Sequence, residues 1–356
     1  MTTIIKKLPN ICLYSAQFSK ISPSAFFRVR NGCCFHFIVD KLFKANNLDR
    51  SLLLPNLVRT AHIGTVIHKL FEERVKGLIQ TEDDYESRWE QYIKNEEDKI
   101  KINYPTISGI SFSDYDKMYE SMETAFRINA YSQSRTSTTA DSVKLEFPVG
   151  YKDLIYGTID RLNISQNEIE IIDYKSGEVF DESGNIKNSI VLQLNLYAIC
   201  CEFSFNKPVS KLTVIRTKDL TEIDIPIIRE QYQELVDEIS IFLNKLNSTT
   251  EFESFQIPSE ESCAFCSCKH LCKKYLESDI RSPRIVDGYV TDISNRNYIK
   301  LCDNRGQYFT VNKIADINIP DYDKLLGKHL LFTDVNSYVE GVFCRTNKTI
   351  IFELNS

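Results

Sequence analysis

Three residues within one short stretch have the types and spacing that chemistry on a phosphate needs. Asp160 lies in the β-rich segment 154–162, Asp173 lies in the apolar run 169–174, and Lys175 follows two residues later. On an extended chain Asp173 and Lys175 point to the same face. Two neighbouring carboxylates suit a hard cation such as Mg²⁺, and a lysine beside that cation can orient water or stabilise charge. Taken alone, the D-x-K pair is more typical of surface groups at a strand end.

The elements that must position these residues are three short strands and a helix. The segment 143–149 alternates, with apolar residues on one side and Glu146 on the other, which predicts a strand. Segments 154–162 and 169–174 predict two more strands, joined as a hairpin by a turn at 163–167. The helix that follows carries Gln193 and Tyr197 one turn apart on one face.

Three motifs occur here in order: G-T-I-D-R at 157–161, I-D-Y-K-S-G at 172–177 and Q-L-N-L-Y at 193–197. Together they resemble the PD-(D/E)XK nuclease superfamily, and within it the RecB-like branch of the AddB and CRISPR-associated exonuclease type. The resemblance implies an α/β fold, a restriction-endonuclease-like PD-(D/E)XK core with added helices. It also implies that Lys175 is the catalytic lysine, and that Gln193 and Tyr197 hold the substrate strand or the site geometry.

The same resemblance implies a site for Mg²⁺ or Mn²⁺. Its ligands would be His68, from the G-T-V-I-H motif of a helix expected at 60–77, together with Asp160, Asp173 and the backbone carbonyl of Tyr174. Glu146 matches an acidic residue of the first core strand and would bind the metal directly or through water. His62 does not match the motif and is expected to be structural.

Cysteines form a second group, and eleven in one chain are many for a cytoplasmic protein, where clustered cysteines usually mean metal or catalysis. Cys263, Cys266 and Cys272 have the C-x2-C-x5-C spacing that in RecB-like nucleases joins one distant cysteine to hold a [4Fe–4S] cluster, and Cys33 matches that distant ligand. Cys34 and Cys268 are alternates, since Cys34 stands where the family has proline. Zinc is the alternative metal, because four cysteines also form tetrahedral zinc sites. Either metal would join the first helix, expected from 22 to about 44, to the end of the nuclease domain.

Charge is distributed unevenly. Residues 1–80 hold 12 Lys and Arg against 4 Asp and Glu, a charge of +8, and residues 281–356 hold 10 against 9, or +1. The total of −6 therefore leaves −15 on residues 81–280. A basic front end is compatible with contact to a phosphate backbone. No membrane span or secretory signal is recognisable, so we expect a cytoplasmic protein that does not bind membranes.

Two domains are predicted: a nuclease domain at 1–280 and a small β-rich domain at 281–356, possibly an OB-type barrel. In an OB fold, Tyr298, Tyr308 and Phe309 would be candidates for stacking on bases, although core packing or protein docking is at least as typical of such residues. Residues 80–140 predict two helices around a loop at Pro105, without chemistry.

The expected function is a metal-dependent DNA nuclease, an exonuclease on single-stranded DNA or DNA with free ends, in repair, recombination or defence. No G-x-x-x-x-G-K-[ST] motif is present, so unwinding would need a helicase or another partner. The alternatives are a non-catalytic module that binds DNA ends or docks a partner, and an RNA-cleaving enzyme.

Overall fold

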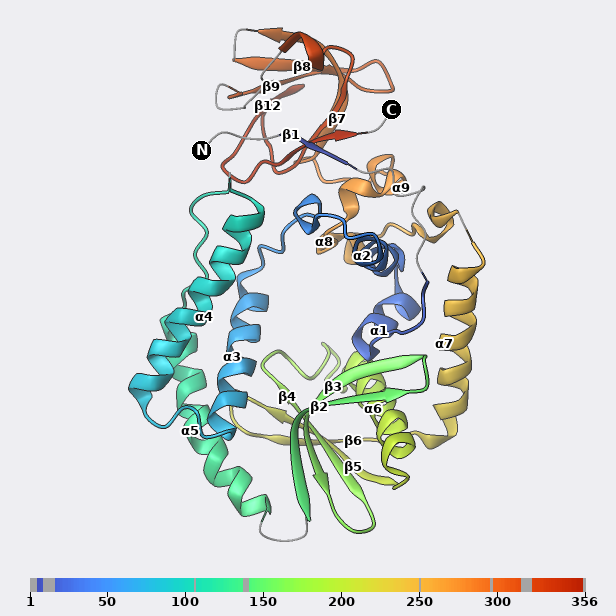
Figure 1. Cartoon of the computed structure of the whole chain (residues 1–356). Coiled ribbons are helices and arrows are strands. Elements are labelled where there is room, and N and C mark those ends of the chain that lie inside the picture. The colour runs from blue at the N-terminus through green and yellow to red at the C-terminus, as the bar shows by residue number, and fades with distance from the viewer. Residues whose placement is uncertain are drawn as a thin grey trace.

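The computed structural model describes residues 5–8, 17–105, 107–136, 141–249, 251–294, 297–314 and 322–354. A five-stranded sheet lies at one end of the molecule and an eight-stranded sheet at the other. Helices on two sides connect them (Figure 1). The fold is mixed α/β, as the sequence predicts.

The five-stranded sheet has the order β2-β3-β4-β5-β6. Its strands are Ser142–Tyr151, Ile155–Ile164, Ile169–Lys175, Val209–Arg216 and Glu222–Ile225. The three strands predicted around the D-x-K pair are confirmed, with the β3–β4 turn at 165–168. Only the β4–β5 pair is parallel, which explains why β4 reads as a continuous apolar run: its residues are buried on both faces.

Helix α6 (Asn188–Phe205) covers this sheet, with α7 (Tyr232–Asn247) packed against it. The sequence of α6 is apolar almost all round, and ten of its residues are buried, as expected for a helix enclosed in the core. This core also receives side chains from the first helices of the chain.

A second core surrounds α3 (Arg59–Val75), α4 (Glu82–Asn103) and α5 (Tyr115–Thr136). Thr81 and Asp84 form a capping box that starts α4. The two helices predicted on either side of Pro105 are confirmed, and Trp89 is buried between them and their neighbours.

The single helix predicted from 22 to 44 is wrong, because the chain forms α1 (Pro23–Asn31) and α2 (Phe35–Ala45). The break falls at Gly32, which approaches another segment closely. A Cβ atom there would lie 2.9 Å from the Ser262 Oγ atom and 3.2 Å from the Arg28 carbonyl oxygen. The interruption leaves Cys33 between the helices, opposite the segment that carries the other clustered cysteines.

The eight-stranded sheet has the order β1-β13-β10-β7-β8-β9-β12-β11. Its C-terminal strands are Val286–Ser294, Tyr298–Cys302, Tyr308–Asn312, His329–Phe332, Asn336–Val339, Val342–Cys344 and Ile351–Leu354. The sequence did not suggest two features. Strands β11 and β12 form a further hairpin, and β1 (Ile5–Lys7) from the start of the chain pairs in parallel with β13. The division at residue 280 and the OB-type barrel stay predictions, and β1 ties the two ends of the chain together.

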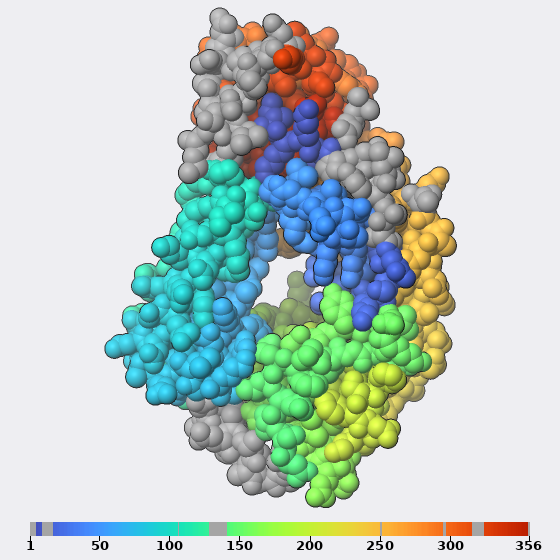
Figure 2. Space-filling model, in the orientation of Figure 1, coloured from blue at the N-terminus to red at the C-terminus, as the bar shows by residue number. Residues whose placement is uncertain are grey.

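The space-filling view shows an opening that passes through the molecule (Figure 2). It is enclosed by the helices at residues 59–103, by the first helices of the chain and by the strands β2 and β3. Among the described helices, none has both the length and the apolar character that crossing a membrane requires.

Candidate active site

The β3–β4 hairpin brings the two predicted aspartates together. The last hairpin pair is Arg161 with Ile172, so Asp160 and Asp173 lie opposite each other where the ladder ends. The Asp160 Oδ2 atom accepts a hydrogen bond of 2.7 Å from the Tyr174 N–H. The hairpin thus places both carboxylates at one point of the sheet.

Lys175 links these carboxylates to α6. Its Nζ atom lies 2.8 Å from the Asp173 Oδ2 atom and donates a hydrogen bond of 3.0 Å to the Gln193 Oε1 atom. Gln193 Nε2 in turn donates to the Tyr197 hydroxyl at 3.4 Å. Four of the predicted site residues therefore form one continuous chain of polar contacts.

Gly157 allows Tyr197 to reach this chain. A Cβ atom at position 157 would lie 2.6 Å from the Tyr197 Cε1 atom, closer than side chains pack. The glycine of the G-T-I-D-R motif is therefore required by the close approach of α6 to β3.

Helix α3 supplies the other wall of the site. His68, Glu146, Asp160 and Tyr174 line one small cavity, which Glu72 and nearby apolar side chains also line. Gly64 lets α3 come close to the end of β4, because a Cβ atom there would lie 3.2 Å from the Ser176 Oγ atom. Glu72 was not predicted as a site residue, although its position one turn after His68 places both on one helix face.

Glu146 has an unusual backbone conformation at this cavity. The pairs Leu145–Arg161 and Phe147–Ile159 on either side place it opposite Asp160 in the neighbouring strand. Its φ of 45° is in the left-handed region that non-glycine residues rarely adopt, and such conformations cluster at functional sites.

Burial shapes the charges of the site. Burial, and then the charge of Asp173, raise the pKa of Asp160 well above its usual value. Burial and the nearby Glu72 raise the pKa of Glu146, whereas burial lowers the pKa of His68 and so favours a neutral imidazole. A positive charge among these groups would stabilise the carboxylates in their ionised form.

The donor types at this site fit a divalent cation: carboxylates, a neutral imidazole and a backbone carbonyl. Among the residues that the structure describes, however, no three His, Cys, Asp or Glu side chains converge closely enough to hold a single ion.

His62, expected to be structural, lies against Glu96 and Phe112, with its Nδ1 atom 2.9 Å from the Glu96 Oε2 atom.

Four of the predicted cysteines meet at a second place, far from the carboxylates in sequence. Cys33, Cys263, Cys266 and Cys272 line one small cavity, together with Phe35 and Lys269 among others. Helix α8 (Glu260–Ala264) carries Cys263, and α9 (Lys273–Leu276) begins directly after Cys272.

The two alternate cysteines do not line this cavity. Cys34 packs into the core of the five-stranded sheet, and its burial raises its pKa to about 12. The Sγ atom of Cys268 lies 3.4 Å from that of Cys266. This hydrogen bond lowers the pKa of Cys266 to about 7, so that thiol is readily converted to the thiolate that binds metals.

A known protein family matches most of the chain. The family model of the PD-(D/E)XK nuclease superfamily matches residues 20–273, most of the chain. The chain therefore belongs to the PD-(D/E)XK nuclease superfamily, whose members hydrolyse phosphodiester bonds and generally use Mg²⁺ or Mn²⁺.

No curated protein matches the sequence significantly. Among solved structures, one titled "Crystal structure of SSO0001" is 15% identical and covers 58% of this chain and 84% of its own, with a TM-score of 0.26. Such a score carries no argument about this fold.

Proposed function

We propose that this protein is a Mg²⁺- or Mn²⁺-dependent deoxyribonuclease of the RecB-like branch, acting as an exonuclease on single-stranded DNA or on DNA with free ends. The observation that carries this proposal is the continuous contact from Asp173 through Lys175 and Gln193 to Tyr197, beside Asp160. A module that only binds DNA would not need a buried carboxylate, Asp173, beside the half-buried Asp160, with a lysine held against it.

His68, Asp160, Asp173 and the carbonyl of Tyr174 would hold the cation, and Glu146 would contact it directly or through water. When bound, the ion supplies a water of lowered pKa and neutralises charge on the scissile phosphate. Asp160 supports this assignment, because its pKa is raised by burial and by Asp173. That cost falls when a cation neutralises the pair.

Lys175 would position the attacking water and stabilise the charge that develops on the phosphate. Its ammonium group lies between the Asp173 carboxylate and the Gln193 amide oxygen, so two partners fix its direction. Gln193 and Tyr197 are positioning residues in this scheme. His68, with its lowered pKa, stays neutral at physiological pH and keeps a nitrogen lone pair for a ligand.

The opening through the molecule supports the requirement for a free end (Figure 2). Helix α3, which carries His68, borders that opening, and the strands of the hairpin lie at its edge (Figure 1). A strand that threads through a closed ring must have an end. A helicase or another DNA-processing partner in repair, recombination or defence would supply such single strands.

We further propose that Cys33, Cys263, Cys266 and Cys272 hold a [4Fe–4S] cluster, with zinc as the alternative. The four cysteines surround one cavity, and thiolates are the usual ligands of such clusters. The preference for the cluster over zinc rests on the resemblance of the C-x2-C-x5-C spacing and the distant Cys33 to the RecB-like family. Its role would be structural, joining the turn after α1 to the segment 263–272.

The proposal is tested by cleavage of end-labelled linear and covalently closed circular single strands, with Mg²⁺, Mn²⁺ or EDTA, using protein purified without oxygen. We expect metal-dependent degradation of the linear strand, resistance of the circle, and loss of cleavage in Lys175→Ala. Equal cleavage of the circle would contradict exonuclease action. Binding without cleavage under every metal would favour the end-binding module.

A further inference from the structure

A groove of about 410 Å³ lies between the nuclease region and the C-terminal sheet, at the N-terminal end of α3. Three parts of the chain form its walls: residues 54–58, the cysteine segment around Phe265, and C-terminal residues that include Arg284 and Lys348. Nothing in the proposed chemistry of the active site uses this groove.

The lining of the groove has the character of a surface for single-stranded nucleic acid. Phe265 lines the groove and is 77% exposed, so its ring is accessible to a base. Lys269, Arg284 and Lys348 are its basic residues and Asp334 its single acidic one. Because Arg284 pairs with Asp334 at 2.7 Å, the charges of the two lysines are in excess. An exposed aromatic ring between basic groups can stack on a base while the charges contact phosphates.

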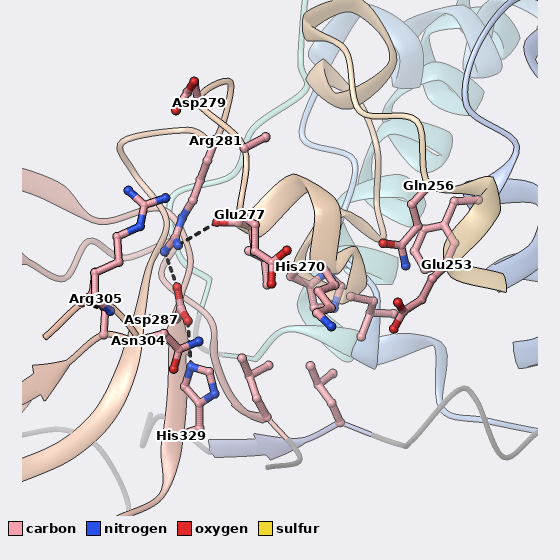
Figure 3. A pocket seen from close by; sticks show the side chains of 18 of the residues that line it. Glu253, Gln256, His270, Glu277, Asp279, Arg281, Asp287, Asn304, Arg305 and His329 are labelled. Carbon is pink, nitrogen blue, oxygen red and sulfur yellow. Dashed lines mark hydrogen bonds and ion pairs between the residues drawn. The ribbon is translucent and has the colours of Figure 1, made fainter. Parts of the chain in front are cut away.

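The other large cavity at this boundary has the opposite charge (Figure 3). It has three basic residues against five acidic ones. They are Lys273, Arg281 and Arg305, and Glu253, Glu277, Asp279, Asp287 and Asp303. That cavity would repel a phosphate backbone, so the two cavities provide an internal comparison.

A path leads from the groove to the active site along α3. Val58, in the groove, and His68, at the site, are ten residues apart, which is about 15 Å along a helix. On the face of His68 the intervening residues are small: Ala61, Gly64 and Thr65, of which Ala61 and Thr65 are exposed. A strand can therefore run past Ala61 and Thr65 without displacing large side chains, whereas at Gly64 the Ser176 side chain packs close to the helix.

The groove also adjoins the cysteine cavity. Cys266 and Lys269 line both, and the Leu54 N–H donates a hydrogen bond of 2.7 Å to the Ser267 carbonyl. The conformation of the cysteine segment therefore sets the shape of one wall of the groove.

We propose that this groove binds the part of a single DNA strand that extends from the active site along α3. The ring of Phe265 stacks on a base, and Lys269 and Lys348 contact phosphates. The link to the active site rests on the proposed nuclease function, whereas strand binding in the groove does not depend on cleavage.

The test is fluorescence anisotropy of the full chain with labelled oligo(dT) in EDTA, over a series of lengths and salt concentrations. We expect Phe265→Ala to weaken binding of long oligonucleotides about fivefold or more. Lys348→Glu should weaken binding. It should also lower the slope of the logarithm of the binding constant against the logarithm of the salt concentration by about one. The matched controls are Tyr338→Ala, since Tyr338 is 79% exposed on β11, and Lys273→Glu in the acidic cavity. Both should bind as the wild type does.

Photo-cross-linking of an iododeoxyuridine oligonucleotide gives a second measurement that needs no variant, and we expect the linked peptide to contain Phe265. Unchanged binding by both groove variants, or loss of binding in Lys273→Glu alone, would contradict the proposal that the groove binds single-stranded DNA. The nuclease function would stand in that case if Asp173→Asn abolishes cleavage. If Asp173→Asn still cleaves while Phe265→Ala binds weakly, strand binding in the groove is supported and the assigned active site is wrong.

Discussion

The carboxylate site and the cysteine cavity are built in different ways. The carboxylates and the lysine lie within residues 160–175, on two neighbouring strands, with Asp173 buried and Lys175 paired with it. The cysteine cavity joins Cys33 to residues 263–272, more than 200 positions away. Removing charges from water costs stability, so a charge cluster positioned by one hairpin is more typical of a functional site than of a stabilising one. A contact between distant segments, in contrast, constrains the fold. Substitutions at the two places should therefore have different consequences.

The largest expected effect is on activity. Asp173→Asn should lower cleavage by at least about 10³-fold, because the amide removes the negative charge that holds the cation and Lys175. The thermal midpoint should change little, since the neutral side chain also relieves repulsion with Asp160. The cleavage rate measures the loss of activity and a melting curve measures the thermal midpoint. Asp292→Asn, on β7, is the control. Unfolding of Asp173→Asn without a change in specific activity would contradict the view that the carboxylate site serves function and the cysteine cavity serves stability.

The next effect should fall on stability. Cys263→Ser should lose bound iron and lower the thermal midpoint by about 5 °C or more, because a metal that joins two segments contributes its binding energy to folding. Iron and zinc analysis of protein purified without oxygen, with a melting curve, measures both. Cys302→Ser, in the C-terminal sheet, should keep the metal. Stoichiometric zinc in the wild type would replace the cluster by a zinc site, and retention of full iron by Cys263→Ser would remove that residue from the ligands.

A third prediction concerns the stability of the protein at low pH, which depends on the contacts of Asp287. Asp287 lies 2.6 Å from an Arg281 nitrogen and 2.7 Å from the His329 Nε2 atom (Figure 3). Burial alone would raise the pKa of Asp287, but the hydrogen bond from His329 and the charge of Arg281 lower it overall. Its stabilising contribution is therefore complete above the unfolded pKa of about 4 and is lost as the pH falls through the lower folded value.

Asp287→Asn should accordingly cost about 1–3 kcal/mol in the free energy of unfolding at pH 7, and its stability should fall less steeply than that of the wild type below pH 4. Urea unfolding at several pH values provides the comparison. Parallel pH profiles for the two proteins would show that Asp287 does not contribute to the acid sensitivity.

The smallest expected effect is at the edge of the active site. Gln193→Ala removes the amide oxygen that accepts from Lys175, which should lower kcat about tenfold by loosening the lysine. KM should change little, because Lys175 and the carboxylates remain. Gln233→Ala, on the exposed face of α7, is the matched control. A change in KM alone would assign Gln193 to substrate binding instead of positioning.

Much of the carboxylate site could be predicted from the sequence because it depends on local order. Alternation and apolar runs predict β2, β3 and β4, and the spacing of Gln193 and Tyr197 places them on one helix face. The sequence could not show the contact of Lys175 with Gln193 or the position of Glu72, since these depend on how α6 and α3 pack on the sheet.

Long-range features were harder to predict. The helix break at Gly32 has a local signal in Asn31-Gly32, but the close approach of Gly32 to Ser262, some 230 residues later, cannot be read from a local pattern. Strand β1 joins the C-terminal sheet for the same reason: its parallel partner is β13, at the other end of the chain. Short strands such as β11 and β12, with three or four residues each, carry too little periodicity to be recognised.

We propose that His68, Asp160 and Asp173 form one site for a divalent cation, separate from the cysteines. The most direct test of this proposal is a Mn²⁺ titration followed by electron paramagnetic resonance, on the wild type, Asp173→Asn and Cys302→Ser. We expect a tight Mn²⁺ site in the wild type and in Cys302→Ser that is lost in Asp173→Asn. Equal Mn²⁺ binding by all three proteins would contradict the proposal.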